Sequence, residues 1–230
     1  MATAAPTAMS TGTAPMRDDA QLLTLAQWLS PAYPVGGFAY SHGLESAVRA
    51  GWIADAGGLE TWLEDVLEHG SGRADAIWLH LAHRCADGDD LMALDDEARA
   101  FAPARERLRE GARQGAAFAR TTGEVWGLDL PDLLLPLALG RAARLMGMAP
   151  GPVAALYLHA FAGNLVAAAQ RLMPMGQTAA QRVLAGLTPL CAAVAEATAT
   201  ADLDDIASTA FLSDVAAMTH ETLEPRIFQS

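Results

Sequence analysis

The sequence predicts an all-α protein, built as a single compact helical-bundle domain of about nine or ten helices. Three observations favour this fold class. Apolar residues recur at the spacing of a helix face along nearly the whole chain, alternating strand patterns are scarce, and the composition is rich in alanine, a strong helix former. The 230 residues contain no repeat of fixed period and no long linker, which suits one domain.

The chain opens with residues 1–18, which we expect to form a disordered N-terminal tail ahead of a helical domain at 19–230. Residues 1–16 are mostly alanine, threonine, proline and serine, and they lack the basic and apolar regions of a secretory signal. Asp18 or Asp19 can cap the first helix, whose leucines follow at helical spacing. Further helices are expected at 41–50, around 59–67, around 77–85, and at 103–122, 132–147, 152–173, 177–199 and 204–220.

The second half of the chain is unusually apolar. Residues 145–169 carry no formal charge, but Pro150 and Pro152 interrupt them and leave only about 17 uninterrupted residues, at the lower limit for a membrane span. We therefore interpret this stretch as a buried helix and expect no membrane association. Its apolar groups lie on more than one side, which predicts a homodimer or a hetero-complex. Pro189 should kink the helix that contains it.

Charge and cysteine content exclude several classes of function. The chain has 27 acidic and 15 basic residues, for a net charge of −12, and an acidic protein is poorly suited to bind nucleic acid. All the basic residues are arginine, so the lysine required by a phosphate-binding P-loop or a Schiff base is absent. We expect no nucleotide hydrolysis by this chain. Cys85 and Cys191 lie far apart, which suits a reducing compartment such as the cytoplasm.

One expected helix carries potential metal ligands. His80, His83 and Asp87 share one face, with Cys85 beside them, and could bind a transition metal. The simpler interpretation is the solvated polar face of an amphipathic helix, since neither an HExxH nor a paired CxxC motif is present.

Ser41 offers an enzyme hypothesis. Residues 39–43 resemble a relaxed nucleophile elbow with Ser41 as nucleophile, a motif that requires a strand before it. Proline and glycine precede it instead, so Ser41 is more simply the N-cap of the following helix.

Four arginines fall along one side of a later helix. Surface ion pairs with Glu106 and Glu110 explain much of this pattern, and a docking surface for an acidic partner is the functional alternative. The arginines are Arg105, Arg109, Arg113 and Arg120.

The least helix-like ordered stretch is 30–45, where two prolines and two adjacent glycines force a shaped loop with three aromatic residues. Residues 29–45 are similar to the signature S-P-x-x-P-V/I-G-x-F/Y-x-x-S-x-G-L-E of the urease accessory protein UreF family. Residues 171–181 resemble the family's R-L-x-P-L-G-Q-T-x-x-Q, and residues 220–230 its H-E-T-x-x-x-R-L-F-x-S. The resemblance covers about residues 20–230, with departures at Pro225 and Gln229.

The resemblance implies an all-α, non-enzymatic cytoplasmic protein with no cofactor or bound metal of its own. Such proteins form dimers and bind an accessory subunit called UreD, or UreH in some organisms. That pair recruits the UreG GTPase and delivers nickel to apo-urease. On this resemblance the expected partner-binding residues are Tyr33, Pro34, Gly36, Gly37, Phe38, Tyr40, Ser41, Gly43, Glu45, Gln177, Gln181, His220, Glu221, Arg226 and Phe228.

The loop and the C-terminus carry apolar side chains that suit partner binding. Phe38 and Tyr40 should contribute to partner binding more than to folding, the alternative being that both rings pack into the core. The tail at about 222–230 should be mobile in the free protein, with Phe228 filling a pocket of the UreD-like partner. The competing interpretation is that Phe228 folds back onto its own domain.

Overall fold

The computed structural model describes residues 18–230, and within them it confirms the all-α class, with no strand. The expected disordered tail lies outside the described residues except for Asp18, where α1 begins. The elements are α1 (Asp18–Trp28), η1 (Gly37–Ala39), α2 (Leu44–Arg49), α3 (Ala56–His69), α4 (Ser71–Arg84), α5 (Gly88–Phe101), α6 (Arg105–Trp126), α7 (Leu135–Leu145), α8 (Pro150–Leu172), α9 (Gln177–Ala197), η2 (Leu203–Asp205) and α10 (Phe211–His220).

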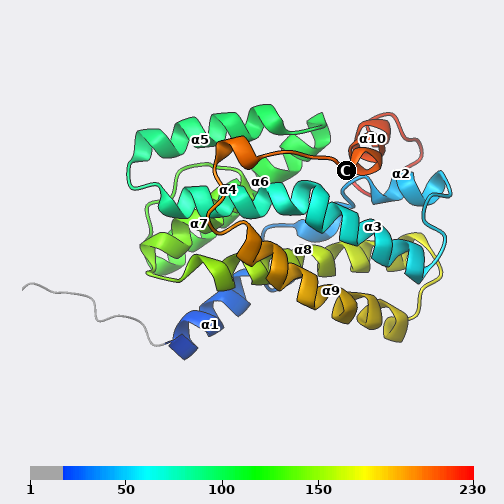
Figure 1. The fold of residues 1–230 in the computed structure, drawn as a ribbon, viewed down its shortest axis with the longest axis horizontal. Coiled ribbons are helices and arrows are strands. Elements are labelled where there is room, and N and C mark those ends of the chain that lie inside the picture. Colours follow the sequence, from blue (N-terminus) through cyan, green and yellow to red (C-terminus); the bar gives the residue numbers. More distant parts are fainter. Residues whose placement is uncertain (1–17) are drawn as a thin grey trace, which may run out of the picture.

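Helix α4 forms the centre of the bundle and packs against α3, α5, α7 and α8 (Figure 1). Helix α9 lies along α8 and α3, and α6 packs on α7. The close approach of α4 and α7 requires a glycine, because a Cβ atom at Gly140 would collide with the carbonyl oxygen of Leu79. The short helix α2 pairs with α10 at one end of the bundle, where the chain also ends.

The apolar helices α8 and α9 are part of this bundle. Their most apolar windows have mean hydropathies of 1.4 and 1.2, so by length and composition alone both are able to cross a membrane. In α8, half of that window is buried inside the fold, including Leu158, Ala162 and Leu165. The same helix therefore contributes to the core and leaves a second, partly covered face. Helix α9 continues through Pro189 to Ala197, and the kink stays a prediction.

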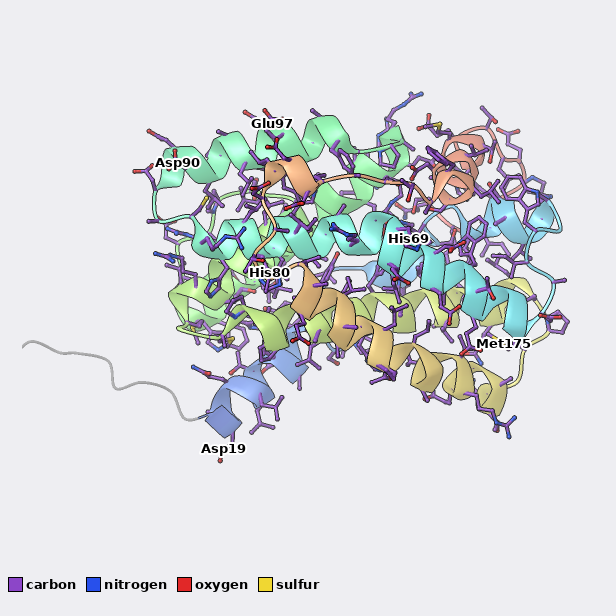
Figure 2. All side chains as sticks on the ribbon, in the orientation of Figure 1. Asp19, His69, His80, Asp90, Glu97 and Met175 are labelled. Atoms are coloured by element: carbon purple, nitrogen blue, oxygen red, sulfur yellow. The ribbon has the colours of Figure 1, made fainter. Side chains whose placement is uncertain are left out.

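The sequence reading missed α5. Its segment is strongly acidic, and only Leu91, Leu94 and Ala98 form its buried apolar stripe. Asp90 and Glu97 project outward from this helix (Figure 2). Because so few apolar residues mark its inner face, the segment has the composition of a solvated loop although it folds as a helix.

Two expected helices have wrong starting points. The helix expected at 41–50 begins only at Leu44, because His42 and Gly43 adopt positive φ angles of 59° and 77°. The helix expected at 204–220 begins only at Phe211. Asp205 belongs instead to the short element η2, where it forms a reciprocal capping box with Asp202.

The histidines of α4 hold helices together. His80 is buried, with Nε2 3.1 Å from the carbonyl oxygen of Ala195, and burial lowers its pKa. Nε2 of His83 lies 2.9 Å from the carbonyl oxygen of Met148. No group of three or more potential metal ligands occurs among residues 18–230. The structure therefore gives the metal hypothesis no support, and the expectation that His80 lies on a solvated face is wrong.

Candidate partner-binding surface

The loop before α2 presents one aromatic side chain to solvent. Phe38 is 72% exposed at the middle of η1, just after Gly36 turns the chain with a φ of 73°. Helix α8 holds this turn from below: Asn164 Nδ2 donates to the Gly37 carbonyl oxygen at 3.0 Å, and Arg171 donates to that of Phe38 at 2.9 Å. Phe38 therefore projects from a backbone that is fixed by hydrogen bonds.

The other two aromatic residues of the loop belong to the core. Tyr33 packs against Phe118, and its hydroxyl lies 2.7 Å from Thr122 Oγ1. Tyr40 is only 6% exposed, so the expectation that it serves partner binding rather than folding is wrong in this structure. Both rings are buried, while Phe38 between them is exposed to solvent.

Other expected surface residues lie open to solvent. Pro34, Gln177 and Gln181 are exposed, and Gly36 and Gly37 are half-buried. Gln181 and Phe38 border the same cavity, which places the second sequence block near the loop.

Ser41 is completely buried and contacts the end of the chain. Its hydroxyl donates to the Ser230 carbonyl oxygen at 2.5 Å and accepts from the backbone N–H of Glu45 at 3.3 Å. The residue that caps α2 is Gly43, not Ser41. No strand precedes Ser41 within the described chain, and Nε2 of the adjacent His42 bonds Ser71 instead. The geometry does not match a nucleophile elbow.

Gly43 permits α2 and α10 to touch. It has a positive φ, and a Cβ atom there would lie 2.6 Å from the backbone nitrogen of Ala217 in α10. Any larger residue would separate the two helices that carry Glu45 and His220.

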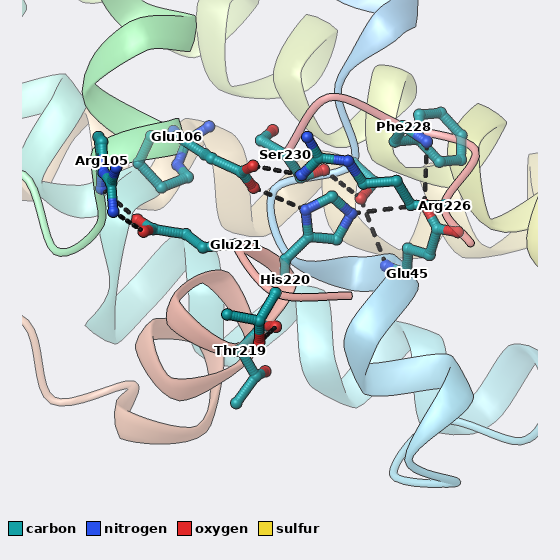
Figure 3. Close-up of polar contacts among 12 residues, drawn as sticks. Glu45, Arg105, Glu106, Thr219, His220, Glu221, Arg226, Phe228 and Ser230 are labelled. Atoms are coloured by element: carbon teal, nitrogen blue, oxygen red, sulfur yellow. Dashed lines mark hydrogen bonds and ion pairs between the residues drawn. The ribbon is translucent and has the colours of Figure 1, made fainter. Parts of the chain in front are cut away.

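Buried carboxylates bind the C-terminal tail (Figure 3). Glu45, 5% exposed, accepts the backbone N–H of Ile227 at 2.8 Å and that of Phe228 at 2.9 Å. His220, at the end of α10, is fully buried between two carboxylates: Nδ1 lies 2.7 Å from Glu106 and Nε2 lies 3.4 Å from Glu45.

Helix α6 supplies the remaining acids of this tail-binding cluster, which we define as Glu45, Glu106, Glu110 and His220. Glu106 forms an ion pair with Arg226. Glu110 accepts a hydrogen bond from the Ser230 hydroxyl at 2.7 Å. The cluster therefore contacts four of the last five residues, which are Arg226, Ile227, Phe228 and Ser230.

Two further contacts secure this end of the molecule. The guanidinium of Arg171 lies over the Phe228 ring, 4.2 Å from its centre, while also bonding the Phe38 carbonyl. Glu221 accepts from the backbone N–H of Arg105 at 2.7 Å and from its guanidinium at 3.0 Å. Arg171 thus joins the exposed loop to the tail.

The structure contradicts the exposed placement expected for Phe228. Its ring is only 3% exposed, so it does not stand free to fill a partner's pocket, and the fold-back interpretation agrees with the structure. The reason is that Glu45 of α2 accepts the backbone N–H groups of Ile227 and Phe228, while Glu106 and Glu110 of α6 bind the side chains of Arg226 and Ser230. The neighbouring Ile227 is 59% exposed and takes the outward position instead.

Sequence reasoning missed several residues at this surface. Glu106 and Glu110 were expected to pair with arginines on the surface of α6, but both point inward, and Glu110 pairs with Arg107. Nothing local in the sequence distinguishes them from surface acids. Arg171 could have been found from the sequence, because it is the first residue of the motif at 171–181. The exposed apolar face of α10 also went unnoticed; it consists of Phe211, Leu212, Val215 and Met218.

Comparison with known proteins places the chain among urease accessory proteins. The UreF family profile matches residues 53–188. The UreF protein of Ruegeria pomeroyi is 50% identical over 210 residues, covering 91% of this chain and 97% of its own length. That of Cereibacter sphaeroides strain ATCC 17029 is 54% identical over 211 residues, covering 92% and 99%. That of Roseobacter denitrificans is 47% identical over 208 residues, covering 90% and 93%. These matches span nearly all of the folded domain, and the chain therefore belongs to the UreF family of urease accessory proteins.

Proposed function

We propose that this chain is a non-enzymatic scaffold in urease maturation. It binds a UreD/UreH-type accessory subunit, and together they recruit a UreG-type GTPase that delivers nickel to apo-urease in the cytoplasm. The observation that carries this proposal is the similarity to UreF proteins across about nine-tenths of the chain. The absence of lysine supports the assignment of nucleotide chemistry to the partner GTPase.

Phe38 is the anchor of the proposed partner surface. A large aromatic ring that is exposed yet fixed by its backbone contributes strongly to binding, because little conformational entropy is lost when it is covered. Pro34, Gln177 and Gln181 extend this surface, and Arg226 and Ile227 lie beyond it on the tail. The buried members of the expected set act by holding the surface in shape; they are Tyr33, Tyr40, Ser41, Gly43, Glu45, His220 and Phe228.

We also propose that the chain forms a homodimer through α8. Leu156 and Phe161 on this helix are only half-buried, and the helix carries a single charged residue, Arg171. An apolar, nearly uncharged helix face is typical of an interface between like subunits.

Reconstituted activation tests the scaffold role. Apo-urease is mixed with the UreD-type subunit, the UreG-type GTPase, nickel and GTP, and the nickel bound per urease active site is measured with and without this chain. We expect nickel loading only when the chain is present. Phe38→Ala should reduce loading at least fivefold, whereas Met92→Ala, which truncates an exposed apolar residue on α5, should not. Full loading without the chain would refute the proposal.

A further inference from the structure

A large cavity opens beside the loop that carries Phe38, and it shares Glu110 with the tail-binding cluster. Its volume is about 800 Å³, and its wall is formed by residues of α1, the loop before η1, and helices α4 to α10. Binding sites for small molecules measure roughly 300–1,000 Å³ and combine a mostly apolar wall with a few convergent polar groups. This cavity has both properties.

The charged side chains of the wall are Asp75 from α4, Arg107 and Glu110 from α6, and Asp214 from α10; Tyr157 from α8 adds a hydroxyl. The Tyr157 hydroxyl donates to Asp75 at 2.6 Å, while Arg107 is paired with Glu110. Among residues 18–230, no cationic side chain pairs with Asp75. The wall therefore holds three carboxylates and one guanidinium, an excess of negative charge.

The apolar wall is rich in aromatic rings. Trp78 and Phe101 form an edge-to-face pair with centroids 6.3 Å apart, and Tyr157 and Phe161 are stacked at 6.4 Å. Aromatic faces attract ammonium groups as well as hydrocarbon. The indole N–H of Trp28, which also lines the cavity, is buried without an acceptor. A buried donor without a partner is uncommon in a native protein and calls for a ligand or a water molecule.

We propose that this cavity binds a small organic amine with an apolar body, its ammonium group beside Asp75 and its hydrocarbon along the aromatic wall. The charge of the wall decides the sign of the ligand. Asp75 has no salt bridge among residues 18–230, and Arg107, which acts on it electrostatically, is itself paired with Glu110. The volume decides its size, because one lysine side chain from a partner protein would leave most of the space empty. Burial raises the pKa of Asp75 to about 6, and a bound ammonium would hold the carboxylate ionised. The inference does not depend on the scaffold role.

Calorimetric titration of the full chain tests the assignment. The probes are n-octylammonium and n-octanoate, which carry opposite charges on alkyl chains of similar length. Both are used well below their critical micelle concentrations. We expect one saturable octylammonium site and at least tenfold weaker binding of octanoate. Asp75→Asn, which keeps an acceptor for Tyr157, should weaken octylammonium binding at least tenfold. Asp96→Asn, on the exposed face of α5, is the matched control and should bind like the wild type.

A second variant separates loss of the site from loss of the fold. Ala160→Phe fills part of the cavity from α8 without altering Asp75, and it should weaken octylammonium binding at least fivefold. The proposal is overturned if octylammonium shows no saturable binding, if octanoate binds equally well, or if Asp75→Asn binds like the wild type. It is also overturned if nickel ions displace the probe from the wild type at equimolar concentration, because the carboxylate would then serve a metal.

Discussion

Glu45, the acidic residue that ends the motif at 29–45, contacts the C-terminal end of the chain. Its carboxylate is buried and faces two backbone N–H groups and an imidazole. A carboxylate taken out of water is costly unless such donors replace its hydration. The sequence places Glu45 in a shared motif, but only the fold shows that its partners lie more than 170 positions away.

Replacing Glu45 with glutamine should destabilise the protein by about 2 kcal/mol, because charge-assisted hydrogen bonds to the tail become weaker or are lost. Denaturant unfolding measures the change, and hydrogen exchange at Ile227 and Phe228 should accelerate. Glu221→Gln is the control: its partner Arg105 is 70% exposed, so a loss below about 1 kcal/mol is expected. Equal losses in the two variants would contradict the role given to Glu45.

Phe38 and Phe228 should respond oppositely to truncation. Phe228→Ala removes a buried ring and should cost about 3–5 kcal/mol of unfolding free energy. Phe38→Ala removes an exposed ring and should change stability by less than about 0.5 kcal/mol. Thermal or urea unfolding of both variants checks this difference. A large loss in Phe38→Ala would mean that this ring supports the fold rather than a partner contact.

Asp75 should make stability depend on pH. Burial raises the pKa of its carboxyl from 3.8 to about 6. The hydrogen bond from Tyr157 and the charge of Arg107 act in the opposite direction, and the charge of Glu110 raises the pKa further. The folded state then binds the proton more tightly than the unfolded chain. This group therefore costs stability as pH rises from about 4 to 6, by at most roughly 3 kcal/mol.

Asp75→Asn cannot ionise and should escape this loss. Its free energy of unfolding should match the wild type near pH 4 and exceed it above pH 6. Urea unfolding across this range provides the measurement, with Asp96→Asn as an exposed control. A stability difference that stays constant with pH would contradict the raised pKa.

At the scale of elements, helical spacing predicted most of the bundle, because a long amphipathic helix shows its buried face in the sequence. It failed where that signal was weak. In α5 only three residues mark the inner face, and the helix expected from residue 204 begins only at Phe211, because Asp204 and Asp205 belong to η2. The tail was misjudged for another reason: its partners Glu45 and Glu106 come from helices distant in sequence, and no local pattern indicates such pairing.

Deleting residues 224–230 should therefore destabilise the isolated chain. The deletion exposes the site of Phe228 and leaves the carboxylates of Glu45 and Glu106 without their tail partners. We expect a lower melting temperature, by several degrees or more, in differential scanning calorimetry. Removing only Gln229 and Ser230 keeps Phe228 and should have a smaller effect. An unchanged melting temperature after the full deletion would show that the tail does not contribute to folding.

At the scale of the whole molecule, the sequence gives the family but not the surface. Of the fifteen residues expected to contact partners, about half are buried in this structure. Signature residues include those that hold a backbone in place as well as those that touch a partner, and a sequence alone does not separate these roles. Exposure separates them, and it leaves Phe38 on a loop that α8 and the tail both support.

We propose that this chain acts by assembling other proteins through the Phe38 surface. Size-exclusion chromatography with light scattering tests it most directly, using the chain, a UreD-type subunit and a UreG-type GTPase, alone and mixed. We predict one assembly that contains all three proteins for the wild type, and its loss in Phe38→Ala at unchanged stability. An unaltered elution of the wild-type chain as a free 24.1 kDa monomer in the mixture would contradict the account.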